Sequence, residues 1–399
     1  MRIFFSAGEP SGDQHAAHLI QELRSRRSDF AAEGFGGPEM RKQGCSLLFE
    51  LTQLAVMGFL RVVPLLAKFR RLVRQAEAHF DQSPPDAVVL IDFPGFNWWI
   101  ARAARRRGIP VYYYLPPQLW AWAGWRIRRV RKWVDHVICA LPFEYDWYRS
   151  RGVKTTWVGH PFFDEVAART LDKPLMRQFQ SADSQQTPTV VIGLLPGSRN
   201  HEVDRNWPLM LEVVKTVSGS VDGIRWIVAN YRPEHSVTCR NLQQQAGLPE
   251  TIDIQYVAGK TSEIIEAADC CLMVSGSVSL ELLARRTPGV VLYRGHRIGL
   301  IASWFLMKCR FITLVNLIAD REVMPEFISV GDPTRDIRSM AGHLVNWCRN
   351  RDELQHKADE MAALADRAAI TGATGRVADL LERELATGNG TLPATAEAA

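Results

Sequence analysis

Short runs of apolar residues alternate with longer stretches of helical periodicity along most of the chain. In the first half, each strand-like run leads into a loop or a helix-like stretch, of which residues 13–26 are the first. The strand-like runs of this half are residues 2–8, 86–93, 109–115 and 136–142. Continuous apolar runs separated by amphipathic helices are typical of parallel strands buried on both faces. The pattern therefore predicts an α/β fold whose parallel sheet is covered by helices.

The same rhythm begins again after a polar stretch, DSQQTP, at residues 183–188. The strand-like runs of the second half are residues 189–199, 223–230, 252–258, 268–277 and 288–294. A chain of 399 residues is also too long for one ordinary core. We therefore predict two Rossmann-like parallel-sheet domains that face a cleft, with the hinge near residues 160–186. The expected domains are residues 1–165 and 166–345, followed by helices at 346–386 that pack back across the domains and a disordered tail at 387–399.

The basic residues are unevenly distributed, although the net charge is only +5. Clusters at residues 61–74, 105–107 and 126–132 indicate an anionic partner: a membrane surface, a phosphorylated ligand or nucleic acid. Solvated helix faces are the alternative for any single cluster. The seven cysteines form no C-x-x-C pair, which argues against a zinc site and for a reducing compartment. No apolar run approaches the ~20 residues of a membrane span, and the first is too short for a signal peptide, so we expect a cytoplasmic protein.

Glycine- and serine-rich loops follow two strand-like runs of the second half. In open parallel sheets, ligands bind beyond the carboxyl ends of the strands. One loop carries Gly197, Ser198 and Arg199, and its arginine can hold phosphate oxygens. The other consists of Ser275, Gly276, Ser277, Val278 and Ser279. It precedes a helix-like run whose first N–H groups favour an anion, and Glu281 suits a ribose diol. Together the loops predict a nucleotide diphosphate site, although tight strand–helix connections capped by serines are the alternative.

Neither loop matches the phosphate loop of ATPases or the dinucleotide-binding glycine pattern. ATP hydrolysis and dinucleotide redox chemistry are therefore poorly supported. Histidines and carboxylates do not recur at metal-ligand spacing, so we expect no metal site.

Two loops of the first half carry candidate substrate contacts. The loop at residues 6–13, SAGEPSGD, contains Gly8, Ser11, Gly12 and Asp13. A substrate role for this loop and a helix-capping role for Asp13 explain the sequence equally well. Asp92 follows a buried strand and is surrounded by aromatic residues, so desolvation would raise its pKa and suit it to act as a general base. A carboxylate bonded to the loop backbone is the alternative.

One helix-like stretch offers a surface for lipid. Leu65, Leu66 and Phe69 fall on one face, and lysine and arginine occupy the other. A helix packed on the sheet is one interpretation, and a helix resting on an anionic membrane is the other. We predict that these three residues contact lipid at least in part. Residues 116–133 interleave tryptophan with arginine, but no recognised nucleic-acid module accompanies them, so we expect no nucleic-acid partner.

A series of short motifs, in one order along nearly the whole chain, resembles the lipid-A-disaccharide synthases. The motifs are SAGEPSGD, GFGGPEM, LAVMGFLRVV, IDFPGFN, WAW, LPFE, VGHP, LLPGSR, SGSVSLE, VVLYR and LVNLIADREVMPEF. So many motifs in the same order make the resemblance highly specific.

The resemblance implies a GT-B glycosyltransferase in which residues 1–165 form the acceptor and membrane side and residues 166–345 bind the UDP-sugar. It implies transfer of 2,3-diacylglucosamine from its UDP donor to 2,3-diacylglucosamine 1-phosphate, with inversion and without cofactor or metal. It also implies a peripheral protein on the cytoplasmic face of the inner membrane. It leaves the oligomeric state open.

By motif, Asp92 matches the family's essential aspartate, the base for the acceptor 6-hydroxyl. Arg199 matches the essential arginine at the nucleotide, and Asn316 matches another residue needed for activity. The loop and helix start at residues 275–281 match the segment that contacts UDP.

Two departures from the family pattern concern the acceptor. Many relatives carry aspartate where this chain has Gly95, and many carry a basic residue where it has Ala123. Contacts with the acceptor phosphate are then expected at Arg126. The alternatives to a disaccharide synthase are another GT-B enzyme acting on a UDP-sugar, such as a UDP-sugar epimerase, and a non-catalytic protein that binds a lipid surface or a nucleotide.

Overall fold

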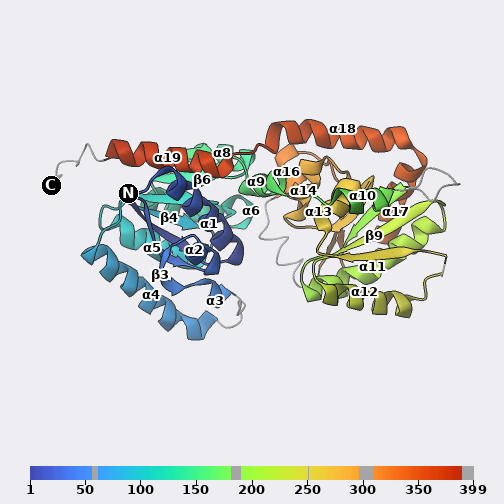
Figure 1. Cartoon of the computed structure of the whole chain (residues 1–399), viewed down its shortest axis with the longest axis horizontal. Coiled ribbons are helices and arrows are strands. Elements are labelled where there is room, and N and C mark those ends of the chain that lie inside the picture. The colour runs from blue at the N-terminus through green and yellow to red at the C-terminus, as the bar shows by residue number, and fades with distance from the viewer. Residues whose placement is uncertain (56–61, 181–189, 250, 296–308, 389–399) are drawn as a thin grey trace. The chain divides into compact units, whose positions relative to one another are not determined.

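The computed structural model describes residues 1–55, 62–180, 190–249, 251–295 and 309–388. The chain divides into two compact units, each built on one parallel sheet as the sequence predicts (Figure 1). Unit 1 comprises Met1–Asp164 and the C-terminal segment from Thr371, and unit 2 comprises Glu165–Ile370. None of the described helices combines the length and the hydropathy that crossing a membrane requires.

Unit 1 has a seven-stranded sheet in the order β3-β2-β1-β4-β5-β6-β7, and every neighbouring pair is parallel. Its strands are β1 (Arg2–Ala7), β2 (Ala31–Gly36), β3 (Ser46–Glu50), β4 (Ala87–Ile91), β5 (Val111–Tyr114), β6 (His136–Cys139) and β7 (Thr155–Trp157). Its helices are α1 (Pro10–Arg26), α2 (Pro38–Lys42), α3 (Thr52–Ala55), α4 (Val62–Gln82), α5 (Pro94–Arg105), α6 (Leu119–Trp122), η2 (Gly124–Arg126), α7 (Ile127–Trp133), α8 (Pro142–Arg149) and α19 (Ala373–Gly388). Helix α9 (Pro161–Ala168) begins in unit 1 and ends in unit 2.

Apolar side chains cover both faces of this sheet. Along β1, Phe4 belongs to the cluster on one face, whereas Ile3 and Phe5 belong to the cluster on the other. This is the two-residue alternation of a strand that is buried on both sides. Helix α4 contributes Leu72 to the first cluster, together with other residues of its inner face. Residues on the inner face of helix α1 belong to the second cluster.

The last helix, α19, belongs to unit 1 and packs against α1 (Figure 1). Val377 and Leu381 are buried in the same apolar cluster as the inner face of α1. Arg26 on α1 pairs with Asp379 and Glu382 on α19. The structure therefore divides the predicted group of helices at 346–386: two belong to unit 2, and α19 returns to unit 1.

Unit 2 has a six-stranded parallel sheet in the order β10-β9-β8-β11-β12-β13. Its strands are β8 (Val190–Leu195), β9 (Ile224–Asn230), β10 (Ile254–Ala258), β11 (Cys270–Val274), β12 (Gly289–Arg294) and β13 (Glu326–Ser329). Its helices are α10 (Lys173–Gln180), α11 (Asn200–Ser218), α12 (Pro233–Ala246), α13 (Thr261–Ala267), α14 (Val278–Arg285), α16 (Leu314–Ala319), α17 (Thr334–Arg349) and α18 (Arg351–Ala368). Trp207, Trp226 and Trp347 are fully buried and form the centre of its core.

Candidate active site

The turn that follows β4 holds Asp92 in an unusual backbone conformation. Asp92 has φ 49° and the next residue, Phe93, has φ 45°. Left-handed backbone at residues other than glycine costs about 1–3 kcal/mol each, and it persists only where the surroundings impose it. The side chain of Asn97 supplies such a restraint, because its amide nitrogen donates to the carbonyl oxygens of Asp92 at 2.8 Å and of Ile91 at 3.2 Å.

Two further buried side chains fix this turn. The hydroxyl of Ser6 donates to the amide oxygen of Asn97 at 2.6 Å, and the amide nitrogen of Asn97 donates to the carbonyl of Ser6 at 3.1 Å. The hydroxyl of Tyr113 donates to the carbonyl of Asp92 at 2.8 Å. Asn97 on α5, which Ser6 of β1 holds, and Tyr113 of β5 therefore keep the backbone of Asp92 in place. Asn97 lies within the motif IDFPGFN, but no residue pattern in the sequence predicts a role for it or for Tyr113.

The carboxyl group of Asp92 has a pKa close to neutral pH. Burial raises its pKa to about 7, and the negative charge of Glu9 adds to the effect. Burial also raises the pKa of Glu144 to about 7, with the charge of Asp92 contributing to that shift. The indole of Trp120 donates to Glu144 at 3.0 Å. A carboxyl group of this pKa can accept a proton from a substrate hydroxyl at physiological pH.

Gly8, in the loop before α1, and Gly12, in the first turn of α1, let this segment pack against the Asp92 turn. A Cβ at Gly8 would lie 2.2 Å from the ring of Phe93, and one at Gly12 would lie 3.7 Å from the Cβ of Asp92. Glycine at position 8 is therefore required for this close approach. Ser11 is exposed in the first turn of α1.

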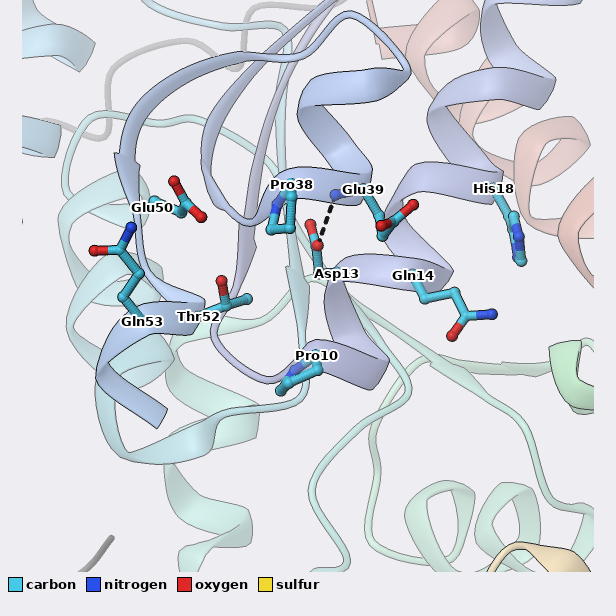
Figure 2. A pocket seen from close by; sticks show the side chains of 9 residues that line it. All are labelled: Pro10, Asp13, Gln14, His18, Pro38, Glu39, Glu50, Thr52 and Gln53. Carbon is cyan, nitrogen blue, oxygen red and sulfur yellow. Dashed lines mark hydrogen bonds between the residues drawn. The ribbon is translucent and has the colours of Figure 1, made fainter. Parts of the chain in front are cut away.

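Asp13 caps a helix, but not the one that its position in the sequence suggested. It lies inside α1, and its two carboxylate oxygens accept from the backbone N–H groups of Gly37 at 2.7 Å, Glu39 at 2.9 Å and Met40 at 3.1 Å. Figure 2 shows the contact with Glu39, which belongs to the first turn of α2. Because these bonds engage both oxygens, the structure favours the capping role over a substrate contact.

Arg126 lies between two exposed tryptophans. Its guanidinium is 4.8 Å from the ring of Trp122 and 5.2 Å from that of Trp125. Burial, followed by the charge of Arg129, lowers its pKa. Within the described part of the chain, its Nε is buried and makes no hydrogen bond. Ala123 is fully buried, so its side chain leaves no room for an exposed cation.

In unit 2, the loop after β8 is bonded to a carboxylate of the protein itself, that of Glu202. Gly197 has φ 125°, and the carboxylate of Glu202 accepts from the backbone N–H groups of Ser198 at 3.0 Å and Arg199 at 3.2 Å. The guanidinium of the exposed Arg199 pairs with the same carboxylate at 2.8 Å. In this structure the two backbone N–H groups and the guanidinium of Arg199 are therefore bound to Glu202. A phosphate reaching them would displace Glu202.

The loop after β11 is open. Gly276 and Ser277 are exposed, and their backbone N–H groups form no hydrogen bond within the described residues. Ser279 is buried, and its hydroxyl donates to the carbonyl of Gly276 at 2.8 Å, which stabilises the turn into α14. The backbone N–H of Ser275 donates to Leu292 on the neighbouring strand at 3.3 Å. The N–H groups of Gly276 and Ser277 lie just before α14, which begins at Val278. They are therefore suitably placed to bind an anion.

Glu281 lies one turn into α14 and is buried. Its Oε1 accepts from the hydroxyl of Ser262 and from Nε of Arg285 at 3.1 Å. Its Oε2 has no hydrogen-bond partner among the described residues, so this oxygen is available to a ligand hydroxyl.

Asn316 does not have the geometry of a catalytic contact. It is completely buried on α16, and its amide nitrogen donates to Met324 and Glu326 at 2.7 Å each. Its amide oxygen accepts from the backbone N–H groups of Val323 at 2.8 Å and Met324 at 2.9 Å. All of its hydrogen-bonding groups are engaged. In this structure Asn316 therefore holds the segment that leads into β13, and its catalytic role stays a prediction.

The predicted lipid contacts differ in their surroundings. Leu66 is 49% exposed. Phe69 is half-buried and packs against the rings of Phe93 at 6.2 Å and Phe96 at 5.5 Å, so packing accounts for much of its surface. The side chain of Leu65 lies outside the described residues.

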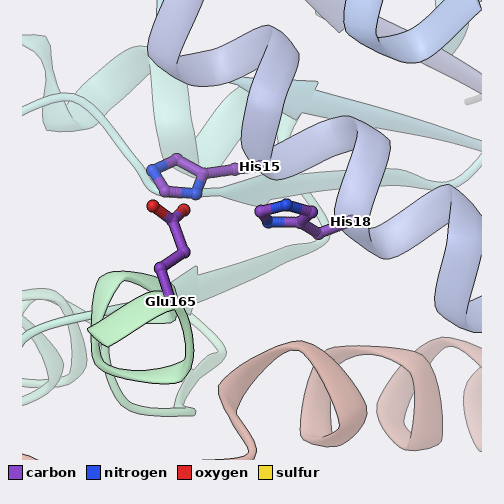
Figure 3. Close-up of side chains that lie close together, drawn as sticks. All are labelled: His15, His18 and Glu165. Atoms are coloured by element: carbon purple, nitrogen blue, oxygen red, sulfur yellow. The ribbon is translucent and has the colours of Figure 1, made fainter. Parts of the chain in front are cut away.

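Figure 3 shows the side chains of His15, His18 and Glu165, which are residue types that can bind a metal ion. Glu165 is the first residue of unit 2, whereas the two histidines belong to α1 in unit 1. Because the group joins side chains of both units, we assign no metal site to it.

Comparison with known proteins identifies the family. A family model described as lipid-A-disaccharide synthetase matches residues 3–369. The chain belongs to this family. A lipid-A-disaccharide synthase of Myxococcus xanthus is 33% identical over 387 residues, covering 95% of this chain and 97% of the relative. The lipid-A-disaccharide synthase of Syntrophus aciditrophicus is 31% identical, covering 93% of this chain and 97% of the relative.

Solved structures of other named enzymes share the architecture of this chain. MurG of Acinetobacter baumannii has a TM-score of 0.59 at 15% identity, covering 96% of this chain and 99% of MurG. The UDP-GlcNAc 2-epimerase of Neisseria meningitidis has a TM-score of 0.62 at 12% identity, covering 96% of this chain and all of the epimerase. At these identities the likeness shows the fold alone, which is the two-domain GT-B fold of glycosyltransferases. Family membership and fold together make this chain a glycosyltransferase.

Proposed function

We propose that this chain transfers 2,3-diacylglucosamine from UDP-2,3-diacylglucosamine to the 6-hydroxyl of 2,3-diacylglucosamine 1-phosphate. The acceptor oxygen forms a bond to the anomeric carbon of the donor as the bond from that carbon to UDP breaks. Attack opposite the leaving group inverts the anomeric centre and gives a β-1,6-linked disaccharide 1-phosphate. The hydroxyl proton passes to a base on the enzyme, and UDP leaves as an anion.

The observation that carries the proposal is the state of Asp92. Its carboxyl group has a pKa raised to about 7, and its backbone is held by Asn97 and Tyr113. A base of this strength is ionised in part at neutral pH, yet it binds a proton tightly enough to assist removal of the hydroxyl proton. We assign Asp92 as the general base.

Unit 2 would supply the donor site. The exposed N–H groups of Gly276 and Ser277 can bind the pyrophosphate, and the free oxygen of Glu281 can accept from the ribose. Arg199 would leave Glu202 to contact the nucleotide, which exchanges one carboxylate partner for a phosphate. Because these groups can stabilise the charge on UDP, we propose that the reaction needs no metal ion.

Peripheral contact with the cytoplasmic face of the inner membrane fits the surface of α4. Leu66 is exposed near its N-terminal end, and the basic residues Lys68, Arg70, Arg71 and Arg74 are exposed along it. A helix with exposed apolar and basic side chains binds anionic bilayers at their interface. Arg126, whose guanidinium has no acidic partner among the described residues, would contact the acceptor phosphate.

The test is release of UDP from UDP-2,3-diacylglucosamine, with and without the acceptor. We expect release and disaccharide formation only with both substrates, and we expect Asp92→Asn to lose about 10²–10⁴-fold in kcat. Asp146→Asn, at an exposed position on α8, is the matched control and should retain the native rate. Conversion of the UDP-sugar without acceptor would favour an epimerase. Absence of turnover in the native chain would favour a non-catalytic binding protein.

A further inference from the structure

A cavity of about 580 Å³, with both polar and apolar surface on its wall, opens at the carboxyl-terminal edge of the unit 1 sheet (Figure 2). The first turns of α1 and α2 form part of its wall, and the segment from the end of β3 into α3 forms the rest. Its lining includes Pro10, Gln14, Glu39, Glu50, Thr52 and Gln53. The edge where parallel strands end is where such folds bind ligands.

The lining offers hydrogen-bonding groups that the protein does not use. The hydroxyl of Thr52 and the side-chain amide of Gln53 have no hydrogen-bond partner within the described part of the chain. The carboxylate of Glu39 contacts Lys42 through Oε1 alone. That of Glu50 contacts Arg41 through Oε2 alone. One oxygen of each carboxylate is therefore left to accept from a ligand.

The charge of the lining limits what can bind. None of the nine lining residues is lysine or arginine, whereas three carry carboxylates: Asp13, Glu39 and Glu50. His18 also lines the cavity, and burial lowers the pKa of its imidazole. A phosphate in this cavity would therefore meet three carboxylates without a lysine or arginine on the wall. Neutral hydroxyl and amide groups can instead donate to the carboxylates and accept from Thr52 and Gln53.

The cavity shares a wall with the Asp92 turn. Asp13, which lines the cavity, follows Gly12 in the sequence, and Pro10, another lining residue, lies two positions before it. A Cβ at Gly12 would lie 3.7 Å from the Cβ of Asp92, so the first turn of α1 has the cavity on one side and the proposed base on the other. The cavity and the proposed base therefore both adjoin the first turn of α1.

We propose that this cavity binds the neutral, hydroxyl- and amide-bearing part of the acceptor sugar, and that the acceptor phosphate stays outside it. The proposal rests on the function proposed above. It assigns Thr52 and Gln53 as residues that orient the acceptor, and it requires a cation elsewhere for the phosphate.

The test uses the full chain and two readouts: the KM for each substrate, and equilibrium binding of 2,3-diacylglucosamine 1-phosphate in detergent micelles. Thr52→Val keeps the shape of the side chain and removes its hydroxyl, and Gln53→Leu removes the amide. Loss of one such hydrogen bond should raise the acceptor KM and weaken acceptor binding about threefold to tenfold. The KM for the UDP donor should not change. Gln82→Leu, at the exposed end of α4, is the matched control and should behave as the native chain.

Unchanged acceptor KM and unchanged binding in both lining variants would overturn the assignment. Glu50→Gln tests the charge argument, because it should weaken binding if Glu50 accepts from a sugar hydroxyl. Tighter acceptor binding in Glu50→Gln would place the phosphate inside the cavity and contradict the proposal. The binding readout needs no turnover: a native chain that binds the acceptor through these residues but transfers no sugar would remove the proposed reaction and leave the cavity assignment standing.

Discussion

Replacing Asp92 by asparagine should stabilise unit 1 while it slows transfer about 10²–10⁴-fold. The folded protein holds this carboxyl group at a pKa of about 7, against 3.8 for an unperturbed aspartate. The folded state therefore binds the proton more tightly than the unfolded state does. Ionised Asp92 opposes folding, and the penalty grows as pH rises from about 4 to about 7. Asparagine stays neutral at every pH and therefore carries no such penalty on folding.

The magnitude follows from the shift. About three pKa units at about 1.4 kcal/mol each amount to about 4 kcal/mol at pH 8 and above. At pH 5 the carboxyl group of Asp92 is protonated in the folded protein and ionised only in the unfolded chain. The difference in the free energy of unfolding between the variant and the native chain should then fall below about 2 kcal/mol. The Asp92→Asn variant should thus unfold at a higher urea concentration than the native chain at pH 8, and the advantage should shrink at pH 5.

The assay is urea denaturation at both pH values, followed by circular dichroism and tryptophan fluorescence. A variant that is no more stable than the native chain at pH 8, or an advantage that is equal at the two pH values, would refute the reasoning. Asp146→Asn should show neither effect, because its carboxyl group is exposed.

Further measurements test other parts of the account. In the native chain, kcat/KM should rise about tenfold per pH unit below pH 7 and level off above it, because the base must be deprotonated. In the same assay, Glu9→Gln should move this rise to lower pH, since the charge of Glu9 raises the pKa of Asp92. Asn97→Ala should lower kcat about 10-fold to 100-fold and destabilise the fold by about 1–3 kcal/mol, measured by steady-state kinetics and denaturation, because buried carbonyls lose their donor. Leu66→Ser should weaken sedimentation with anionic liposomes without a change in stability, and unchanged binding would remove the lipid contact. Activity after EDTA treatment should stay within about twofold of the untreated rate.

The fold class could be predicted because the central strands are continuous apolar runs. Residues 87–91 read AVVLI, and all five are buried. The sequence pattern did not predict β2, whose run AAEGFG is interrupted by Glu33 and by glycines. Gly34 has φ 138°, and a Cβ there would lie 2.0 Å from the carbonyl oxygen of Phe5 on the adjacent strand. The glycine that obscures the strand in the sequence is the residue that lets it pair with β1.

The candidate site could be predicted in part. Asp92 could be located because a polar residue at the end of a buried strand is visible in the pattern. The roles of Asp13 and Asn316 could not be deduced, because their partners lie 24–27 and 7–10 residues away in segments whose geometry no local pattern specifies. The role of Glu202 could not be deduced either, because its contact with the backbone N–H of Ser198 depends on the left-handed turn at Gly197.

The ionisation of Asp92 itself is the most direct test of the central claim. Full-length protein labelled with ¹³C at the aspartate carboxyl carbon can be titrated by NMR, and the resonance that disappears in Asp92→Asn identifies the residue. The account predicts a midpoint of about 7 for that resonance. A midpoint close to the unperturbed 3.8 would contradict it, because such a carboxylate would be too weak a base for the role assigned here.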